Sequence, residues 1–293
     1  MPTSEITIDS LMPPEMAARA EAVGIKKASL DFKTMFALAI LAGAFIAVGA
    51  IYATTVWTGG GALPYGVNRM LGGLVFCLGL ILVVIAGAEL FTGNNLIVMA
   101  WVSRRVSTFQ LLRNWGIVYL GNFVGSILTA IIMLLARQYT FSNGAIGLTA
   151  LNIANAKASL DPIQAFFLGV MCNALVCMAV WLCYSARSTI DKILAIIFPI
   201  SAFVAAGFEH SIANMYFVPM GLLIKDFAPD AFWASSALAN ATPAAITVAN
   251  YAKLTWGNFI LNNLIPVTLG NIVGGAGLVG LVYWFAYLRT RKS

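Results

Sequence analysis

One short stretch of the chain places a carboxylate and an imidazole next to each other. The segment GFEHSIANM, residues 207–215, contains His210, the single histidine among 293 residues, directly after Glu209. An imidazole can donate a hydrogen bond and can change its charge near neutral pH. The flanking sequences, IIFPISAFVAA and YFVPMGLL, are almost purely apolar. An ionisable group in such a setting usually has a function; a hydrogen bond to a neighbouring helix is the alternative interpretation.

A second segment of the same kind lies 120 residues earlier. In GAELFTGN, residues Gly87, Glu89 and Asn94 align with Gly207, Glu209 and Asn214. A carboxylate at the start of a helical segment can accept hydrogen bonds from free backbone N–H groups. We therefore interpret Glu89, Glu209, Asn94 and Asn214 as structural supports of the two segments. Leu90 stands where the later segment has His210, so only the later segment has an imidazole.

The composition places both segments in a membrane. Hydrophobic residues make up 60% of the chain and charged residues 10%, and the mean hydropathy is +0.88, whereas soluble domains have about 25% charged residues. A bilayer core of roughly 30 Å requires about 20 apolar residues for each helical crossing. We expect an all-α integral membrane protein with six transmembrane helices, at about 34–58, 70–102, 111–136, 163–186, 193–224 and 258–288.

The distribution of basic residues predicts the orientation of these helices. Twelve lysines and arginines lie in the N-terminal segment, the second and fourth loops and the tail, and five lie on the opposite face. By the positive-inside rule both termini are cytoplasmic, and we expect the bacterial inner membrane. The net charge of +6 is then a topology signal, which excludes nucleic acid as a partner.

Polar residues at the centre of the second and fifth stretches predict that these two helices are broken, because irregular backbone at membrane depth must be satisfied inside the protein. The third and sixth stretches repeat each other: NWGIVYLGNFVG (114–125) and NLIPVTLGNIVG (263–274) share seven of twelve residues. Two copies of three helices, about 36–136 and 163–288, must cross in opposite directions, as in inverted-repeat transporters. We expect a cytoplasmic amphipathic segment (1–35), a channel domain (36–288) and a cytoplasmic tail (289–293).

The starts of the two half-helices that follow the breaks also indicate what the site binds. A half-helix that begins at a break offers free N–H groups and the positive end of its dipole, and both favour an anion. Thr92 adds a neutral hydroxyl. We expect apolar walls around the site from Phe76, Leu80, Leu90 and Phe203.

These segments, together with NALVCMAVW and NNLIPVTLGNIVGG, resemble the formate/nitrite transporter family over about residues 11–288. The resemblance implies an aquaporin-like fold, a homo-pentamer in lipid with one pore per subunit, and passage of a small anion or its acid; the likeness is closest to the formate channel. It implies His210 as the central pore histidine, with Asn263 positioning it, and we hypothesise that His210 acts as a proton relay. It also implies Thr92 on the loop of the break, Asn173 facing the pore, Lys157 drawing in anions, and constrictions at Phe76, Leu80, Leu90 and Phe203.

Several alternatives stay open at this point. The segments FTGNN and ASLDP depart from the formate pattern, so a nitrite or hydrosulfide channel is the alternative, and acetate and lactate also remain. The sequence is compatible with a channel and with proton-coupled transport, and it leaves open whether the N-terminal segment gates the pore. One histidine is too few for an ammonium channel or for haem, and the four cysteines lack metal-ligand spacing. We therefore expect no enzyme, no metal and no cofactor.

Overall fold

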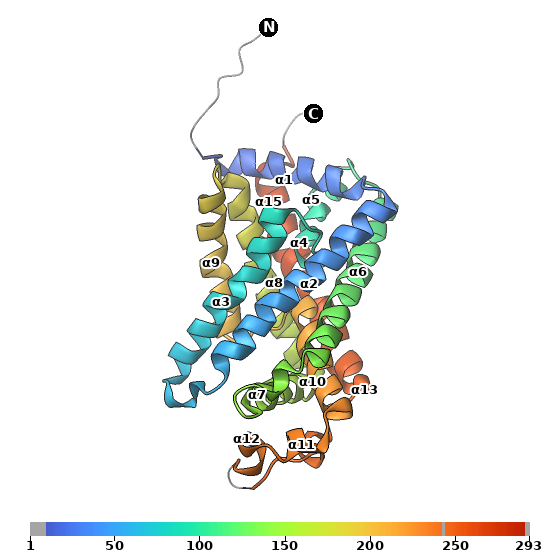
Figure 1. Ribbon diagram of the computed structural model, residues 1–293. Helices are drawn as coiled ribbons and strands as arrows, with labels where there is room; N and C mark the ends of the chain where they lie inside the picture. Colours follow the sequence, from blue (N-terminus) through green and yellow to red (C-terminus); the bar gives the residue numbers. More distant parts are fainter. Residues whose placement is uncertain (1–9, 242–243, 291–293) are drawn as a thin grey trace.

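The computed structural model describes residues 10–241 and 244–290, and these residues form helices and loops with no strand among them. Residues 1–9 of the predicted N-terminal segment, and Arg291 and Lys292 of the predicted tail, lie outside the described residues. The first helix, α1 (Pro13–Ala28), lies across one end of the bundle, close to both described ends of the chain (Figure 1). Its inner face buries Met16, Ala17 and Ala20 against other helices.

The remaining elements follow in two similar series. The first contains α2 (Phe32–Trp57), η1 (Gly60–Ala62), α3 (Tyr65–Ala86), α4 (Phe91–Asn94), η2 (Asn95–Ile97), α5 (Val98–Val102) and α6 (Thr108–Leu135). The second contains η3 (Gln138–Thr140), α7 (Ala145–Ala158), α8 (Pro162–Ser185), α9 (Thr189–Ala205), α10 (Ser211–Phe227), α11 (Asp230–Trp233), α12 (Ser236–Ala239), η4 (Val248–Tyr251), α13 (Trp256–Asn258), η5 (Phe259–Leu264), α14 (Ile265–Ile272), η6 (Val273–Leu281) and α15 (Val282–Tyr287).

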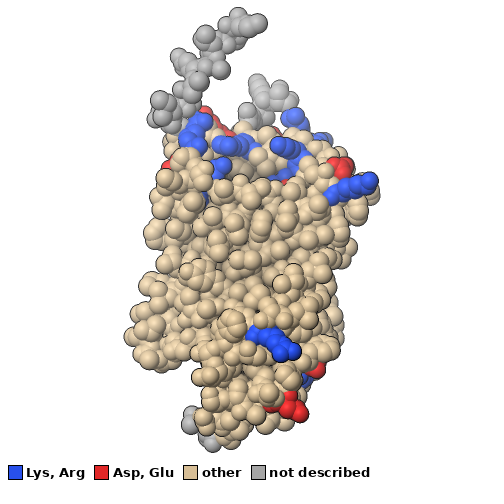
Figure 2. Space-filling model, viewed as in Figure 1, with Lys and Arg blue, Asp and Glu red and all other residues tan. Residues whose placement is uncertain are grey.

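Several of these helices are long and apolar enough to cross a bilayer. Within the described residues, five have the required length and composition: Phe32–Trp57, Tyr65–Ala86, Thr108–Leu135, Pro162–Ser185 and Val248–Tyr287. Helices α9 and α10 have 17 residues each, or about 26 Å at 1.5 Å per residue. On the visible face of the molecule, charged side chains gather near one end and reappear toward the other, with an uncharged band between (Figure 2).

Two short irregular segments separate α3 from α4 and α9 from α10. The first contains Gly87 at φ 81° and the second Gly207 at φ 76°, a left-handed conformation that glycine adopts without steric cost. Each segment then becomes extended, at Leu90 (φ −110°) and at His210 (φ −109°), before the next helix begins. The two segments therefore have the same backbone course.

In each series a close helix pair depends on a glycine. A Cβ atom on Gly125 of α6 would lie 2.0 Å from the Ile40 carbonyl oxygen of α2. A Cβ atom on Gly274 of η6 would lie 2.0 Å from the Val170 carbonyl oxygen of α8. Gly125 and Gly274 are aligned in the sequence repeat, so the same small-residue contact occurs in both halves of the chain.

We expect Gly125→Ala to destabilise the protein, because the new methyl group forces α6 away from α2 at a cost of about 1–3 kcal/mol. Gly116→Ala is the matched control on the same helix, since a Cβ atom there meets nothing within 4 Å. The control is expected to be neutral or to stabilise by about 0.5–1 kcal/mol. Thermal unfolding in detergent measures both variants, and equal midpoints would contradict the role assigned to Gly125.

Candidate functional site

His210 lies at the start of α10 and contacts Thr92, which lies in the first turn of α4 and not on the loop that the sequence analysis expected. Its Nδ1 accepts a hydrogen bond of 3.0 Å from the backbone N–H of Ala213, so the side chain caps its own helix. Its Nε2 lies 2.9 Å from Oγ1 of Thr92, and the histidine is only 3% exposed. Because Nδ1 uses its lone pair, the ring in this arrangement is neutral with its proton on Nε2, which points to Thr92. The structure thus brings together the two polar residues that the sequence analysis expected at the centre.

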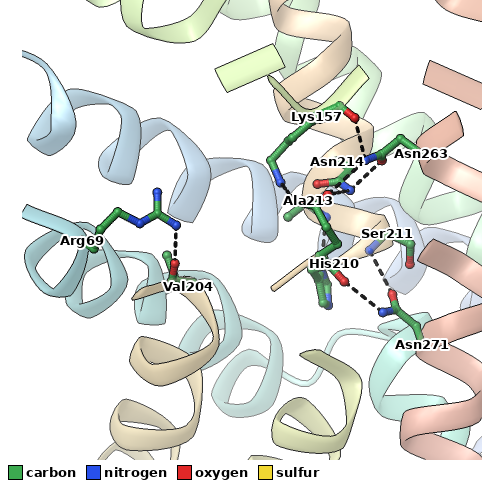
Figure 3. A network of polar contacts seen from close by, with 10 residues as sticks. Arg69, Lys157, Val204, His210, Ser211, Ala213, Asn214, Asn263 and Asn271 are labelled. Carbon is green, nitrogen blue, oxygen red and sulfur yellow. Dashed lines mark hydrogen bonds and ion pairs between the residues drawn. The ribbon is translucent and has the colours of Figure 1, made fainter. Parts of the chain in front are cut away.

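The carboxylate next to His210 is held by three side chains. Glu209 accepts from Nζ of Lys157 at 2.7 Å, from Nδ2 of Asn214 at 2.7 Å and from Nδ2 of Asn263 at 3.0 Å. Asn263 also accepts from Asn214 at 2.7 Å and donates to the Lys157 carbonyl oxygen at 3.1 Å. Figure 3 shows this network above His210.

Asn263 therefore does not have the contact that the sequence analysis gave it. Both ends of its amide are used by Asn214, Glu209 and Lys157, and its described hydrogen bonds do not reach the imidazole. The interaction that fixes the ring comes instead from the Ala213 N–H of the same helix turn. Asn263 thus supports the carboxylate, in the same way as Asn214.

A closely similar network surrounds Glu89, in which Asn114 takes the place of Asn263 but donates to the Met35 sulfur where Asn263 donates to the carboxylate. Lys27 donates to Glu89 at 2.7 Å, Asn94 donates to Glu89 at 2.7 Å and to Asn114 at 2.9 Å, and Asn114 donates to the Lys27 carbonyl oxygen at 3.1 Å. The interpretation of Glu89 and Asn94 as supports agrees with these contacts.

Lys27 belongs to this network, although the sequence analysis did not single it out. The chain contains KASLD twice, at 27–31 and at 157–161, and this repeat would have pointed to it. Lys27 and Lys157 stand at the first position of the two copies, and each binds the glutamate of its own half of the chain.

Two further asparagines hold the backbone of the breaks. Asn122 accepts from the N–H of Phe91 at 2.9 Å and donates to the Glu89 carbonyl oxygen at 2.9 Å. Asn271 accepts from the N–H of Ser211 at 2.9 Å and donates to the Glu209 carbonyl oxygen at 3.0 Å. The first N–H of each half-helix is therefore occupied by an asparagine. Fewer backbone donors remain for an anion than the sequence analysis expected.

Asn173 lies in this supporting layer rather than on a cavity wall. It is fully buried, and its amide donates to the carbonyl oxygen of Asn271 at 2.7 Å, to the side chain of Asn95 at 2.9 Å and to the carbonyl oxygen of Thr92 at 3.3 Å. The expectation that it faces the pore is not met in this arrangement, because packing against the break encloses its amide. Asn173 instead holds the backbone of Thr92.

Two cavities approach the centre from opposite sides of the breaks. The α1-side cavity, about 520 Å³, is lined by Leu80 and Leu90 among others. The α7-side cavity, about 590 Å³, is lined by Phe76, Phe203 and His210 among others. Phe203 stacks on the imidazole with ring centres 5.9 Å apart, and meets Phe76 edge-on at 5.8 Å. The four expected constriction residues, each at most 3% exposed, are thus divided between the two cavities.

Both cavities have an excess of positive charge. The α1-side cavity is lined by four cations, Arg19, Lys26, Lys27 and Lys192, and by the single carboxylate of Glu89. The α7-side cavity is lined by Arg69, Lys157 and the carboxylate of Glu209. Among the residues that the structure describes, no group of three His, Cys, Asp or Glu side chains could hold a metal ion. The charge and the apolar walls suit a small anion that loses its hydration at the centre.

Comparisons with known proteins agree with this geometry. The profile of the family described as "Formate/nitrite transporter" matches residues 14–285. The formate channel FocA of Escherichia coli K12 is 46% identical over 281 residues, which cover 96% of each chain. FocA of Haemophilus influenzae is 43% identical over 93% of each chain.

Solved structures give the same result. A pentameric formate channel with formate bound has a TM-score of 0.81 and 51% identity, and covers 88% of this chain and 98% of its own. An ion channel of the same family has a TM-score of 0.76 at 28% identity, and covers 93% of this chain and 98% of its own.

We expect Lys27→Met to destabilise the protein by about 3–5 kcal/mol, because it leaves the buried carboxylate of Glu89 without its cation. Glu89→Gln is expected to cost less, because the Lys27 side chain that it leaves unpaired is 25% exposed. The double variant is expected to recover much of this loss, since it removes both charges. Lys26→Met is the control: Lys26 is the exposed neighbour and belongs to neither ion pair of the described residues. Thermal unfolding in detergent measures all four proteins. Additive losses in the double variant would contradict the pairing.

Proposed function

The chain belongs to the formate/nitrite transporter family, and from that premise we propose that it is a channel that passes formate across the bacterial inner membrane. The family transports small solutes and is not an enzyme family. The observation behind the proposal is the Thr92–His210 pair, which joins α4 to the start of α10 while His210 lines a cationic cavity with apolar walls. Relatives named as formate channels, matched over nearly the whole chain, support this substrate.

We further propose six crossings with both termini in the cytoplasm. The segments α3–α5 and α9–α10 each count as one broken crossing, and the sixth is Trp256–Tyr287. The two matching networks around Glu89 and Glu209 support an inverted repeat. So does the 2.9 Å contact between Tyr119 and Thr268, which are aligned residues of the two halves. The α1-side cavity is then the cytoplasmic mouth, with α1 at the cytoplasmic membrane surface.

The assembly that we propose is a pentamer in lipid, with one pore in each subunit. Its support is the pentameric formate channel, which matches this chain at 51% identity. The membrane part comprises residues 36–288, and the flanking segments 1–35 and 289–293 lie in the cytoplasm.

The chemistry at the centre follows from two comparable costs. A carboxylate that leaves water for an apolar slit loses several kcal/mol of hydration energy. A carboxyl group with a pKa of about 3.7 needs roughly 4.5 kcal/mol to be protonated at pH 7, at 1.36 kcal/mol per unit. A proton donor near the slit can therefore favour the neutral acid, and His210 is the ionisable group next to it.

The structure constrains how His210 could act as this donor. A second proton on the ring must bind Nδ1, where it opposes the N–H of Ala213 and removes the cap of α10. The resulting imidazolium can pass its Nε2 proton to formate, which leaves as formic acid. The neutral ring then keeps its proton on Nδ1 and must exchange it before the cap can form again. Proton transfer is thus coupled to the first turn of α10.

A nitrite or hydrosulfide channel is the second candidate. The segment FTGNN departs from the formate pattern at Gly93, which lines the α1-side cavity together with Leu90, and this departure favours the second candidate. Acetate and lactate are further candidate substrates.

A substrate panel on protein reconstituted in liposomes tests the proposal. At pH 6 and pH 8, formate uptake is expected to exceed uptake by empty liposomes and to exceed nitrite uptake. Nitrite uptake faster than formate at both pH values would support the second candidate. Absence of uptake for every small anion would overturn the proposal.

For His210→Asn, we expect folding to be kept and the pH dependence of formate uptake between pH 5 and 8 to be flattened. Asparagine is a good cap whose oxygen can still accept from Ala213, but it cannot exchange a proton. Thr92→Ser keeps the hydroxyl and is the control, with a pH profile like that of the wild type. Should His210→Asn reproduce the wild-type profile, the proton relay is wrong.

A further inference from the structure

The charge of Lys157 is already compensated inside the protein. Its ammonium nitrogen lies 2.7 Å from Glu209, and its side chain is 16% exposed. The ammonium group also lies 5.5 Å from the ring centre of Phe217, which closes another side. A pair of opposite charges at this distance has no net charge, so its attraction for an anion falls off faster with distance than that of a single ion. Lys157 is therefore poorly suited to draw anions into the α7-side cavity.

Arg69 is the other cation that lines this cavity, and its partners are neutral. Its Nη2 donates to the carbonyl oxygen of Val204 at 2.6 Å and its Nε to that of Ala205 at 3.4 Å. The guanidinium carbon lies 4.9 Å from the centre of the Trp57 ring. The two ion pairs found among the described residues do not include Arg69. Figure 3 shows the bond from its guanidinium to Val204, separate from the network around Lys157.

The position of Arg69 gives it a second effect. Val204 and Ala205 are the last residues of α9, so the guanidinium caps the negative end of that helix dipole just before the break. The helix end has about half of a unit negative charge, so the combination stays net positive. The rigid fork of arginine can satisfy two carbonyl groups and still present positive charge to the cavity.

From this geometry we propose that Arg69, rather than Lys157, attracts anions into the α7-side cavity and holds them at its mouth. Lys157 is instead a structural partner of Glu209, like Lys27 for Glu89. The inference rests on the proposed function, because it assigns the outward attraction of formate to one residue. It also makes the two mouths unequal. The α1-side cavity is lined by three cations that have no ion pair within the described residues, Arg19, Lys26 and Lys192. In the α7-side cavity, Arg69 is the one lining cation without such an ion pair among the described residues.

The test is formate uptake by right-side-out membrane vesicles, in which external formate meets the α7-side mouth. Arg69→Gln removes the charge but keeps an amide donor for Val204. At low salt we expect its half-saturating formate concentration to rise roughly tenfold, the lower range of electrostatic focusing in a cleft. The maximal rate is expected to stay within about twofold of the wild type. At high salt the difference should shrink, since screening shortens the reach of the charge.

Three comparisons make the result specific. Arg69→Lys keeps the charge and is expected to keep the wild-type half-saturating concentration. Arg137→Gln makes the same chemical change at an exposed arginine that does not line the cavity, and should have no effect. Inside-out vesicles present the α1-side mouth, so Arg69→Gln should leave their half-saturating concentration unchanged.

The outcomes separate this inference from the proposed function. If wild-type vesicles take up no formate, the proposed function fails. If wild-type vesicles transport formate but Arg69→Gln keeps the low-salt value, the function stands and the role of Arg69 is overturned. A rise shared by Arg69→Lys would also overturn it, because the guanidinium fork rather than the charge would then be responsible.

Discussion

The two buried glutamates, each bound by a lysine and by at least one asparagine, make the rest of the structure possible. An irregular segment between two helices inside a membrane protein turns backbone N–H and C=O groups toward apolar surroundings, where each unsatisfied group costs several kcal/mol. Glu89 and Glu209 anchor the two breaks from within, and Asn122 and Asn271 satisfy the adjoining backbone. Because every charge in these networks has a partner, the breaks can lie in the interior, and they place Thr92 and His210 in contact.

The two halves use the same scaffold for different chemistry. At equivalent positions the first half has Leu90 and the second has His210. Leucine cannot cap a helix, whereas His210 accepts from Ala213 with Nδ1 and keeps Nε2 for Thr92. A symmetric site with two histidines would place two like charges at the centre once both rings were protonated. The single imidazole avoids that repulsion and faces one cavity only.

Electrostatic function is also divided between residues. Lys27 and Lys157 have their charge neutralised by glutamates, so they stabilise the breaks more than they influence the cavities. Arg69 at one mouth, and Arg19, Lys26 and Lys192 at the other, interact with carbonyl groups or solvent and keep their positive field. Charged residues at the mouths can therefore be substituted without disturbing the buried network, because such a substitution leaves no buried charge unpaired.

Sequence alone was sufficient for the features that depend on local composition. Apolar length predicted membrane helices, polar residues between Gly87 and Asn94 and between Gly207 and Asn214 marked the irregular segments, and alignment of the halves drew attention to both glutamates. Contacts between distant residues were not predictable in this way. Lys27 was missed although KASLD occurs twice, and Asn263 and Asn173 were assigned to the pore although their amides are enclosed. Side-chain partners separated by 50 to 100 residues depend on how helices pack, and no local pattern records that packing. The tertiary structure therefore decided three features: the Nδ1 lone pair of His210 accepts from Ala213, the charge of Lys157 is neutralised by Glu209, and the charge of Arg69 has no acidic partner among the described residues.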